Sequence, residues 1–234
     1  MSNNEFLSKY DFVLPETTPE TLEELNRRAA SIAGLYIYEL ARLCDFDPPE
    51  DLKKDKGWMG RLIERSLGAF SKNLSVPDFE SIGVELKTLP VDKEGRVLET
   101  TYVTMVPLLE MEERRWEESK VAEKLGTVLW VPLLADRGIA FEERMVGQSI
   151  LWSPDQEELK ILRRDWESHI ETIRDGYVDS ISARDGEVLQ IRPKAASAQD
   201  RRWSIDEDGE AIMTNPRGFY LRRRFTQKIL DDAF

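Results

Sequence analysis

The residues best suited to chemistry are Asp78, Glu85 and Lys87, which stand in one short β-type stretch. Successive side chains of a strand point to opposite faces, so Glu85 and Lys87 share one face while Leu86 takes the other. Pro77 indicates a bend that brings Asp78 back beside Glu85. Two carboxylates suit Mg²⁺, which takes few protein ligands and keeps waters for chemistry. Because a lysine there can position the attacking water and offset phosphate charge, the set predicts metal-dependent phosphodiester hydrolysis.

The same spacing also arises by chance, since 33% of the residues are charged. The alternative is an ordinary strand with a solvated polar face, and the pattern by itself favours it.

Composition limits the other possibilities. The 234 residues, 41% of them hydrophobic, suffice for one domain with a real core. Cys44 is the single cysteine and His169 the single histidine, so an internal disulfide and a zinc site of several histidines are excluded. We assign His169 no role. No apolar run is long enough to cross a membrane, and no signal peptide is evident, so we expect a cytoplasmic protein.

Charge is unevenly distributed along the chain. The net charge is −12, yet residues 214–228 hold several arginines and a lysine without any acid. One basic face can still bind DNA, with an affinity that falls steeply as salt rises.

The elements that must position these residues alternate between helices and strands. The motif Thr18-Pro19-Glu20 predicts a helix start, with Thr as the N-cap and Pro at the first helical position. Strands over residues 84–89 and 98–106, separated by a turn at 92–96, predict a hairpin. The apolar run 127–133 predicts a central strand covered on both faces. Further helices are expected over 35–44, 58–67, 116–125, 154–175 and 225–232, and further strands over 188–191 and 218–221. The pattern predicts an α/β fold with a mixed central sheet flanked by helices.

A series of sequence blocks resembles the MutH family of DNA mismatch-repair endonucleases. The resemblance spans residues 17–230. The blocks, in order, are DKGWMG (55–60), LIE (62–64), LGA (67–69), DF (78–79), GVELKT (83–88), LETT (98–101), VLWVP (128–132), LWSP (151–154), LQIRPKAA (189–196) and PRGFYL (216–221).

This resemblance implies a restriction-endonuclease-like fold, as one nuclease domain over residues 1–234. A helical N-terminal arm and a DNA-reading C-terminal arm would surround one DNA cleft. It implies that Asp78, Glu85 and the Leu86 backbone carbonyl bind Mg²⁺ and that Lys87 acts on water. Glu64 becomes a further active-site carboxylate, able to hold a second metal or orient the waters of the first, although its residue pattern alone favours a surface acid paired with Arg61 or with lysines nearby.

Other positions acquire roles from the same resemblance. Lys124, otherwise a lysine suited to a helix C-terminus, resembles a second active-site lysine that contacts the scissile phosphate. The set that would contact DNA is Lys56, Arg192, Pro193, Lys194, Tyr220 and Arg222. Arginine suits bidentate contacts with guanine. An aromatic ring such as that of Tyr220 can sterically reject an N6-methyl group on adenine. Alternation places Phe219 and Tyr220 on opposite faces, so one of them is expected in the core.

The implied function is Mg²⁺-dependent nicking of the unmethylated strand at hemimethylated GATC, 5′ to the G. The enzyme would act as a monomer, and MutL would activate it after MutS finds a mismatch. One alternative is a type II restriction endonuclease that cleaves both strands at GATC. Another is an inactive module that marks hemimethylated DNA.

One region departs from the family pattern. Residues 198–211 predict a surface loop that Trp203 anchors.

Overall fold

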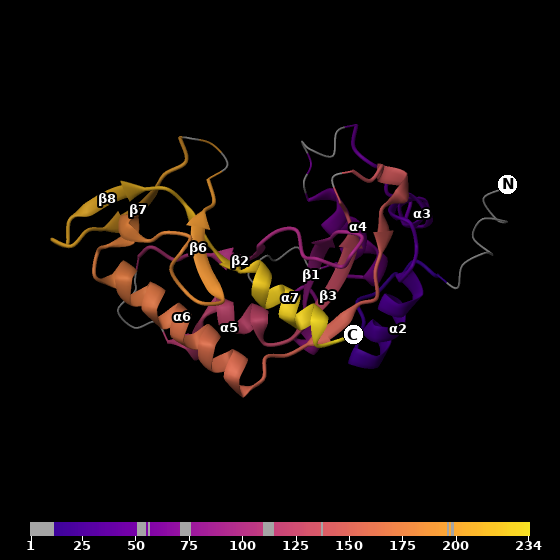
Figure 1. The fold of residues 1–234 in the computed structure, drawn as a ribbon, viewed down its shortest axis with the longest axis horizontal. Coiled ribbons are helices and arrows are strands. Elements are labelled where there is room, and N and C mark those ends of the chain that lie inside the picture. Colours follow the sequence, from indigo (N-terminus) through magenta and orange to yellow (C-terminus); the bar gives the residue numbers. More distant parts are fainter. Residues whose placement is uncertain are drawn as a thin grey trace. The chain divides into compact units, whose positions relative to one another are not determined.

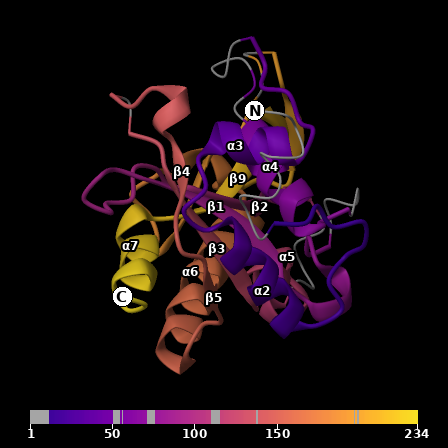
Figure 2. The same cartoon turned by 90° about the vertical axis from the view of Figure 1, so that its right-hand side faces the viewer.

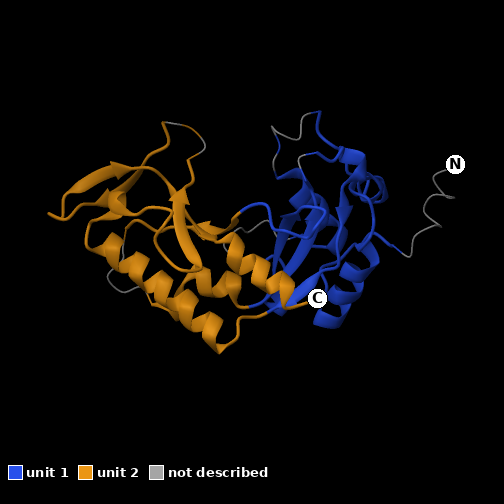
Figure 3. Ribbon diagram, viewed as in Figure 1, with its two compact units in different colours: residues 1–99, 127–152 blue, residues 100–126, 153–234 orange. Residues whose placement is uncertain are grey.

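The computed structural model describes residues 12–50, 55, 57–70, 76–109, 115–136, 138–195, 197 and 199–234. The chain divides into two compact units (Figure 3): unit 1 comprises residues 1–99 and 127–152, and unit 2 comprises residues 100–126 and 153–234. The chain therefore enters each unit twice. The prediction of one nuclease domain with two arms concerns how these units act together, and it stays a prediction.

Unit 1 contains a mixed four-stranded sheet (Figure 1). Strand β3 (Val128–Leu134) lies parallel to β1 (Glu85–Val91) and antiparallel to β4 (Met145–Val146) and β5 (Ile150–Trp152). The first six residues of β3 are buried, which fits the predicted central strand. The mixed sheet and the α/β class are thereby confirmed.

Three helices contribute to the core of unit 1 together with its sheet (Figures 1 and 2): α2 (Leu22–Ile32), α3 (Ile37–Leu43) and α4 (Trp58–Leu67). Helix α4 packs against β1, α2 and α3. Its Leu62 and Ile63 are fully buried, and each contributes about 1.5–3 kcal/mol by leaving water. Short 3₁₀ helices occur at Glu80–Ile82 and Phe141–Glu143.

The start of α2 differs from the prediction. Its N-cap is Thr21, whose side chain accepts a hydrogen bond from the Glu24 N–H at 3.1 Å. The predicted start at Thr18-Pro19-Glu20 is therefore too early. Both threonines suit a cap by residue type, and the burial of Leu25 and Ala29 selects the later one.

The predicted hairpin is wrong, although its turn exists. Asp92 N–H donates to the Arg96 carbonyl at 3.0 Å, and Val91 and Val97 form an isolated bridge. After this turn the chain passes from unit 1 into unit 2, where β2 (Thr101–Met105) pairs with another strand of that unit. A turn determines only where the chain reverses. Strand pairing follows burial: six of the seven residues of β3 are buried, whereas β2 buries only Val103.

Unit 2 has an antiparallel sheet in the order β2–β9–β6, with β9 (Arg217–Leu221) between its neighbours and β6 (Leu189–Pro193) at one edge. Helix α5 (Lys120–Leu125) packs on β2, and α6 (Gln156–Arg174) packs on β6. Helix α7 (Arg223–Asp231) follows β9, and 3₁₀ helices occur at Trp116–Glu118 and Val178–Ser180. Across the described ranges, no helix is long and apolar enough to cross a membrane.

Local signals explain the bounds of the unit 2 helices. Helix α6 starts at a capping box formed by Asp155 and Glu158, and it ends before Gly176, which has φ +86°. The helix predicted over 116–125 is interrupted, because the Ser119 side chain accepts a hydrogen bond from the Ala122 N–H and starts α5 there.

The prediction of a surface loop over 198–211 is wrong, because the chain there forms a two-stranded hairpin of β7 (Arg202–Ile205) and β8 (Ala211–Thr214). The predicted anchoring by Trp203 is wrong, because that side chain is 58% exposed. Its neighbour Ser204 faces inward and donates to the Leu108 carbonyl at 3.4 Å. Alternation along the strand therefore turns Trp203 outward.

Candidate functional site

Asp78 returns to the start of β1 as predicted. Phe79 and Val84 form a bridge, with their N–H groups donating to each other's carbonyls at 2.9 and 3.2 Å. Gly83 completes this reversal with φ +65°, which favours glycine. Phe79 is fully buried and anchors the turn. As a result, Asp78 Oδ2 accepts a hydrogen bond from the Leu86 N–H at 2.8 Å.

Glu85 and Lys87 share one face of β1. Lys87 Nζ donates to Glu85 Oε1, and the two side chains are only 14% and 3% exposed respectively. Leu86 turns to the opposite face and joins the hydrophobic core. A short ion pair in this low-polarity setting holds both charges in a defined place.

Glu64 projects from α4 and is half-buried. Burial raises the pKa of its carboxyl group most, and the negative charges of Asp78 and Glu85 raise this pKa further. Arg61 and Lys87 act in the opposite direction. Arg61 also forms an ion pair with Asp55, and Glu64 is half-buried rather than an exposed surface acid. Three carboxylates and one lysine thus share one electrostatic environment.

The donor set fits a hard divalent cation. Oxygen ligands suit Mg²⁺, which needs only one or two carboxylates besides waters and substrate oxygens. Within the described residues, no group of three or more acidic, histidine or cysteine side chains is arranged to hold a metal ion. Asp78 and Glu85 remain the candidate ligands of such an ion.

The predicted residues of unit 2 occupy two places. Lys124 lies on α5 and is buried. Arg192, Pro193 and Lys194 lie at the end of β6 or just beyond it, and all three are exposed. Lys56 lies outside the described residues.

Tyr220 belongs to an aromatic and cationic cluster. Its ring packs edge-on against Tyr102 with centroids 5.4 Å apart. The Arg192 guanidinium carbon lies 5.8 Å from the Tyr220 ring centroid, and Lys194 Nζ lies 4.4 Å from that of Tyr102. Phe219 is buried and Tyr220 only partly so, as alternation predicted. Burial raises the pKa of Tyr220, so its hydroxyl remains protonated.

Sequence reasoning missed Tyr102 and Gly218 in this cluster. Tyr102 faces Tyr220 across the β2–β9 pair. A Cβ on Gly218 would lie 2.9 Å from Tyr102 Cε2 and 3.1 Å from Tyr220 Cε2. Glycine therefore leaves room for both rings. Only the register between strands distant in the chain could reveal this, and no local pattern carries that register.

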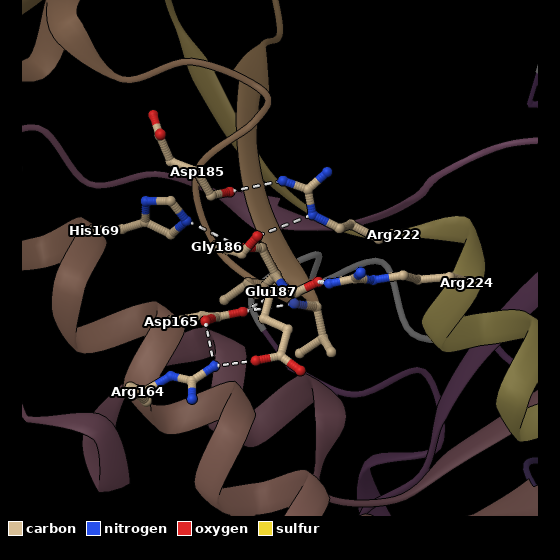
Figure 4. A network of polar contacts seen from close by, with 10 residues as sticks. Arg164, Asp165, His169, Asp185, Gly186, Glu187, Arg222 and Arg224 are labelled. Carbon is tan, nitrogen blue, oxygen red and sulfur yellow. Dashed lines mark hydrogen bonds and ion pairs between the residues drawn. The ribbon is translucent and has the colours of Figure 1, made fainter.

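Arg222 has a structural task as well as a charge. Its guanidinium donates to the carbonyls of Gly186 and Asp185 at 3.1 and 3.0 Å (Figure 4). It also donates to the Ala183 carbonyl at 2.9 Å. The side chain thus holds the turn that precedes β6.

Comparison with known proteins identifies the class of protein to which the chain belongs. A family model described as the DNA mismatch repair enzyme MutH matches residues 67–165. The DNA mismatch repair protein MutH of Shewanella woodyi is 50% identical over 217 residues, covering 93% of this chain and 94% of that protein. The protein of the same name from Shewanella amazonensis is 50% identical over 216 residues, covering 92% and 96%. That from Shewanella sp. strain MR-7 is 49% identical over 220 residues, covering 94% and 99%.

The predicted class, an endonuclease of DNA mismatch repair, is confirmed by these matches. The chain belongs to the MutH family.

Proposed function

We propose that the protein nicks the unmethylated strand of DNA at hemimethylated GATC sites in a Mg²⁺-dependent reaction, 5′ to the G. The observation that carries this proposal is the meeting of Asp78, Glu85 and Lys87 at the start of β1, with Glu64 in the same electrostatic environment. Two carboxylates with one lysine provide charges of both signs at one point, as hydrolysis of a phosphodiester requires.

The candidate site residues of unit 1 each have a role in that hydrolysis. Asp78 and Glu85, with the Leu86 carbonyl, hold Mg²⁺, and Glu64 orients waters or holds a second ion. When bound, Mg²⁺ acidifies water and offsets charge on the phosphate. Lys87 Nζ orients the attacking water, whose oxygen bonds to phosphorus as the P–O3′ bond breaks. The attacking water gives up one proton, the departing 3′ oxygen takes one up to become a hydroxyl, and the 5′-phosphate remains.

The residues of unit 2 read and hold the DNA. Arg192 contacts guanine, with Pro193 and Lys194 beside it, and Tyr220 rejects an N6-methyl group by its bulk. Arg222 supports this surface, Lys56 contacts the backbone, and Lys124 contacts the scissile phosphate. Both units thus serve one duplex, and unit 1 carries the restriction-endonuclease-like catalytic sheet. The protein works as a monomer in the cytoplasm, and MutL activates it after MutS has found a mismatch.

One experiment tests this function. A plasmid with a single GATC site is prepared unmethylated, hemimethylated and fully methylated, and each form is incubated with the protein and Mg²⁺. We expect open circles from the first two forms and no cleavage of the third, with the cut mapped to the unmethylated strand by denaturing electrophoresis. Linear DNA would support the restriction enzyme instead, and metal-independent binding without any cut would support an inactive module.

A further inference from the structure

Unit 2 contains a groove of about 570 Å³ with an unusual lining. Its wall includes five arginines, namely Arg184, Arg192, Arg222, Arg223 and Arg224. None of the described residues lining it is acidic. Charge of one sign around a hollow raises the local concentration of ions of the opposite sign.

Two of these arginines, Arg222 and Arg224, have partners that orient them and preserve their charge. Arg222 donates to three backbone carbonyls, and Arg224 Nε donates to the Glu187 carbonyl at 3.2 Å (Figure 4). A neutral carbonyl fixes a guanidinium without cancelling its charge. By contrast, Arg163 on α6 pairs with Glu117 and Glu167, which neutralise it.

The start of α7 points to the same ligand. Arg222 is its N-cap and makes no side-chain cap, and the first turn contains no acid. Helix α6, in the same unit, begins with Asp155, Glu157 and Glu158. A helix N-terminus carries partial positive charge, so acids stabilise it and arginines oppose it. An anion bound in the groove would relieve this repulsion.

Two buried side chains of α6 hold the groove wall in place. Asp165 Oδ2 accepts hydrogen bonds from the N–H groups of Val188 and Leu189 at 2.7 and 3.0 Å. His169 Nε2 lies 3.1 Å from the Leu189 carbonyl (Figure 4). Asp165 and His169 are 4% and 3% exposed. Burial lowers the pKa of His169, so its ring is neutral and can donate from Nε2. A polar pair buried outside the catalytic residues thus fixes where the chain enters β6.

Gly186 completes the wall between Arg222 and α6. Its φ is +79°, and a Cβ there would lie 1.8 Å from the Leu189 carbonyl oxygen and 3.0 Å from His169 Nε2. The turn can adopt its position only with glycine.

We propose that this groove binds backbone phosphates of DNA, and that Asp165 and His169 are positioning residues that keep its wall in the binding shape. The proposal rests on the proposed function, because DNA supplies the phosphates. A single inorganic phosphate would occupy a small part of the groove, whereas a DNA strand presents several phosphates to arginines that come from two stretches of chain, residues 184–192 and 222–224. Arg184 and Arg224 are exposed contact groups, while Arg222 links wall and helix.

The first test measures DNA binding by fluorescence anisotropy at several salt concentrations, in Ca²⁺ and without cleavage. Arg184→Ala should reduce the slope of log K against log salt by about 0.9, the value for one lost phosphate contact. Arg163→Ala is the matched control, because it removes an exposed arginine of the same unit that glutamates already neutralise. An unchanged slope for Arg184→Ala, or equal losses in both variants, would overturn the proposal.

The second test alters the shape of the groove wall by adding a Cβ at Gly186. Gly186→Ala should weaken DNA binding strongly, whereas Gly209→Ala should not. The two glycines have nearly the same φ, +79° and +82°, but a Cβ on Gly209 meets nothing within 4 Å. Both variants bear the same backbone strain, so only crowding of the wall distinguishes them. Equal binding by both folded variants, with folding checked by circular dichroism, would contradict the wall's role.

The positioning role is tested by kinetics. Asp165→Ala should raise KM for nicking and leave kcat near that of the unaltered protein, since Asp165 holds the backbone that enters β6 and is none of the residues proposed to act on the scissile phosphate. Asp165→Asn should restore KM, because its amide oxygen can still accept both N–H groups. A fall in kcat without a rise in KM, or failure of Asn to rescue a folded protein, would overturn the role.

A final arm separates the sources of phosphate and the two proposals. Inorganic phosphate is titrated against the protein by calorimetry, with and without duplex. Tight binding of inorganic phosphate that DNA does not displace would make this a free phosphate site and overturn the assignment. If the unaltered protein does not nick DNA but Arg184→Ala still reduces the salt slope, the proposed cleavage is contradicted and the proposed phosphate binding by the groove is supported.

Discussion

The two units use positive charge in opposite ways. In unit 1, Lys87 donates directly to Glu85, and both side chains are nearly buried. In unit 2, Arg222 and Arg224 donate to backbone carbonyls and keep their charge. Hydrolysis requires charges of both signs at one point, whereas binding a polyanion requires one sign over a surface. The comparison explains how a chain with net charge −12 can serve a DNA substrate: distribution matters more than the sum.

The largest effect should come from the cation of unit 1. Lys87→Ala should reduce the nicking rate by at least ~10², because the lysine acts on water and on charge that develops during the reaction. DNA binding should be nearly intact. Single-turnover nicking and anisotropy in Ca²⁺ measure the two properties. Lys93→Ala, an exposed lysine of the same unit, is the control. A near-normal nicking rate in Lys87→Ala would show that Lys87 has no role in the reaction, and it would contradict the contrast drawn between the two units.

The carboxylates of unit 1 should prove to be metal ligands. Asp78→Asn keeps an acceptor for the Leu86 N–H but removes the charge, and Glu85→Gln removes the other charge. Both variants should lose most Mg²⁺ affinity by titration calorimetry and lose Mg²⁺-dependent nicking. Asp92→Asn makes the same change at a turn carboxylate that also accepts backbone N–H groups. If Mg²⁺ affinity is undiminished in Asp78→Asn and Glu85→Gln, neither residue is a ligand.

Tyr220 should affect discrimination more than rate. Tyr220→Ser should lower the ratio of nicking rates on unmethylated over fully methylated duplex, because the shorter side chain leaves room for the N6-methyl group. Arg192→Ala should instead lose recognition of GATC by about 1–3 kcal/mol. Tyr177→Ser, at an exposed tyrosine of unit 2, controls for loss of a ring. A constant or rising ratio in Tyr220→Ser would assign that ring to packing alone.

The smallest effect concerns pH and the buried network of unit 2. Burial lowers the pKa of His169 below 6.5 in the folded state. Its neutral form therefore stabilises the fold above pH 6.5, and this stabilisation is lost as pH falls below that value, because the unfolded chain binds the proton first. Denaturant unfolding of the protein and of His169→Gln across this window should show a steeper loss in the former.

The same histidine can be observed directly. Since the chain has one histidine, a single imidazole signal appears in NMR, and it should titrate below pH 6.5. Titration at or above that value would mean that the ring is not held neutral.

Local signals predicted much of the molecule. Helix α4 has the predicted bounds. The spacing of its apolar residues indicates its buried face, and Gly68 marks its C-terminal end. Helix α6 follows from its capping box and Gly176. The approach of Asp78 to β1 followed from Pro77 and from alternation in the strand. These predictions succeeded because each depends on residues close together in the chain.

Predictions that depended on distant segments were less secure. The predicted turn at Asp92 is present, but β1 pairs with β3 and β2 pairs with β9. Trp203 looked like an anchor by residue type, yet the register of β7 with β8 and the inward Ser204 turned it outward. Burial of a whole face outweighs one large side chain.

The sequence by itself indicated the candidate chemical residues of unit 1, the spacing that groups Glu85 with Lys87, and the family to which the chain belongs. Only the tertiary structure decided that Tyr102 lies against Tyr220, that Arg222 holds the turn before β6, and that Asp165 and His169 support an arginine groove. The physical reason is that periodicity and caps act over one or two turns of chain. Pairing between strands and burial of polar groups depend on which distant surfaces exclude water together.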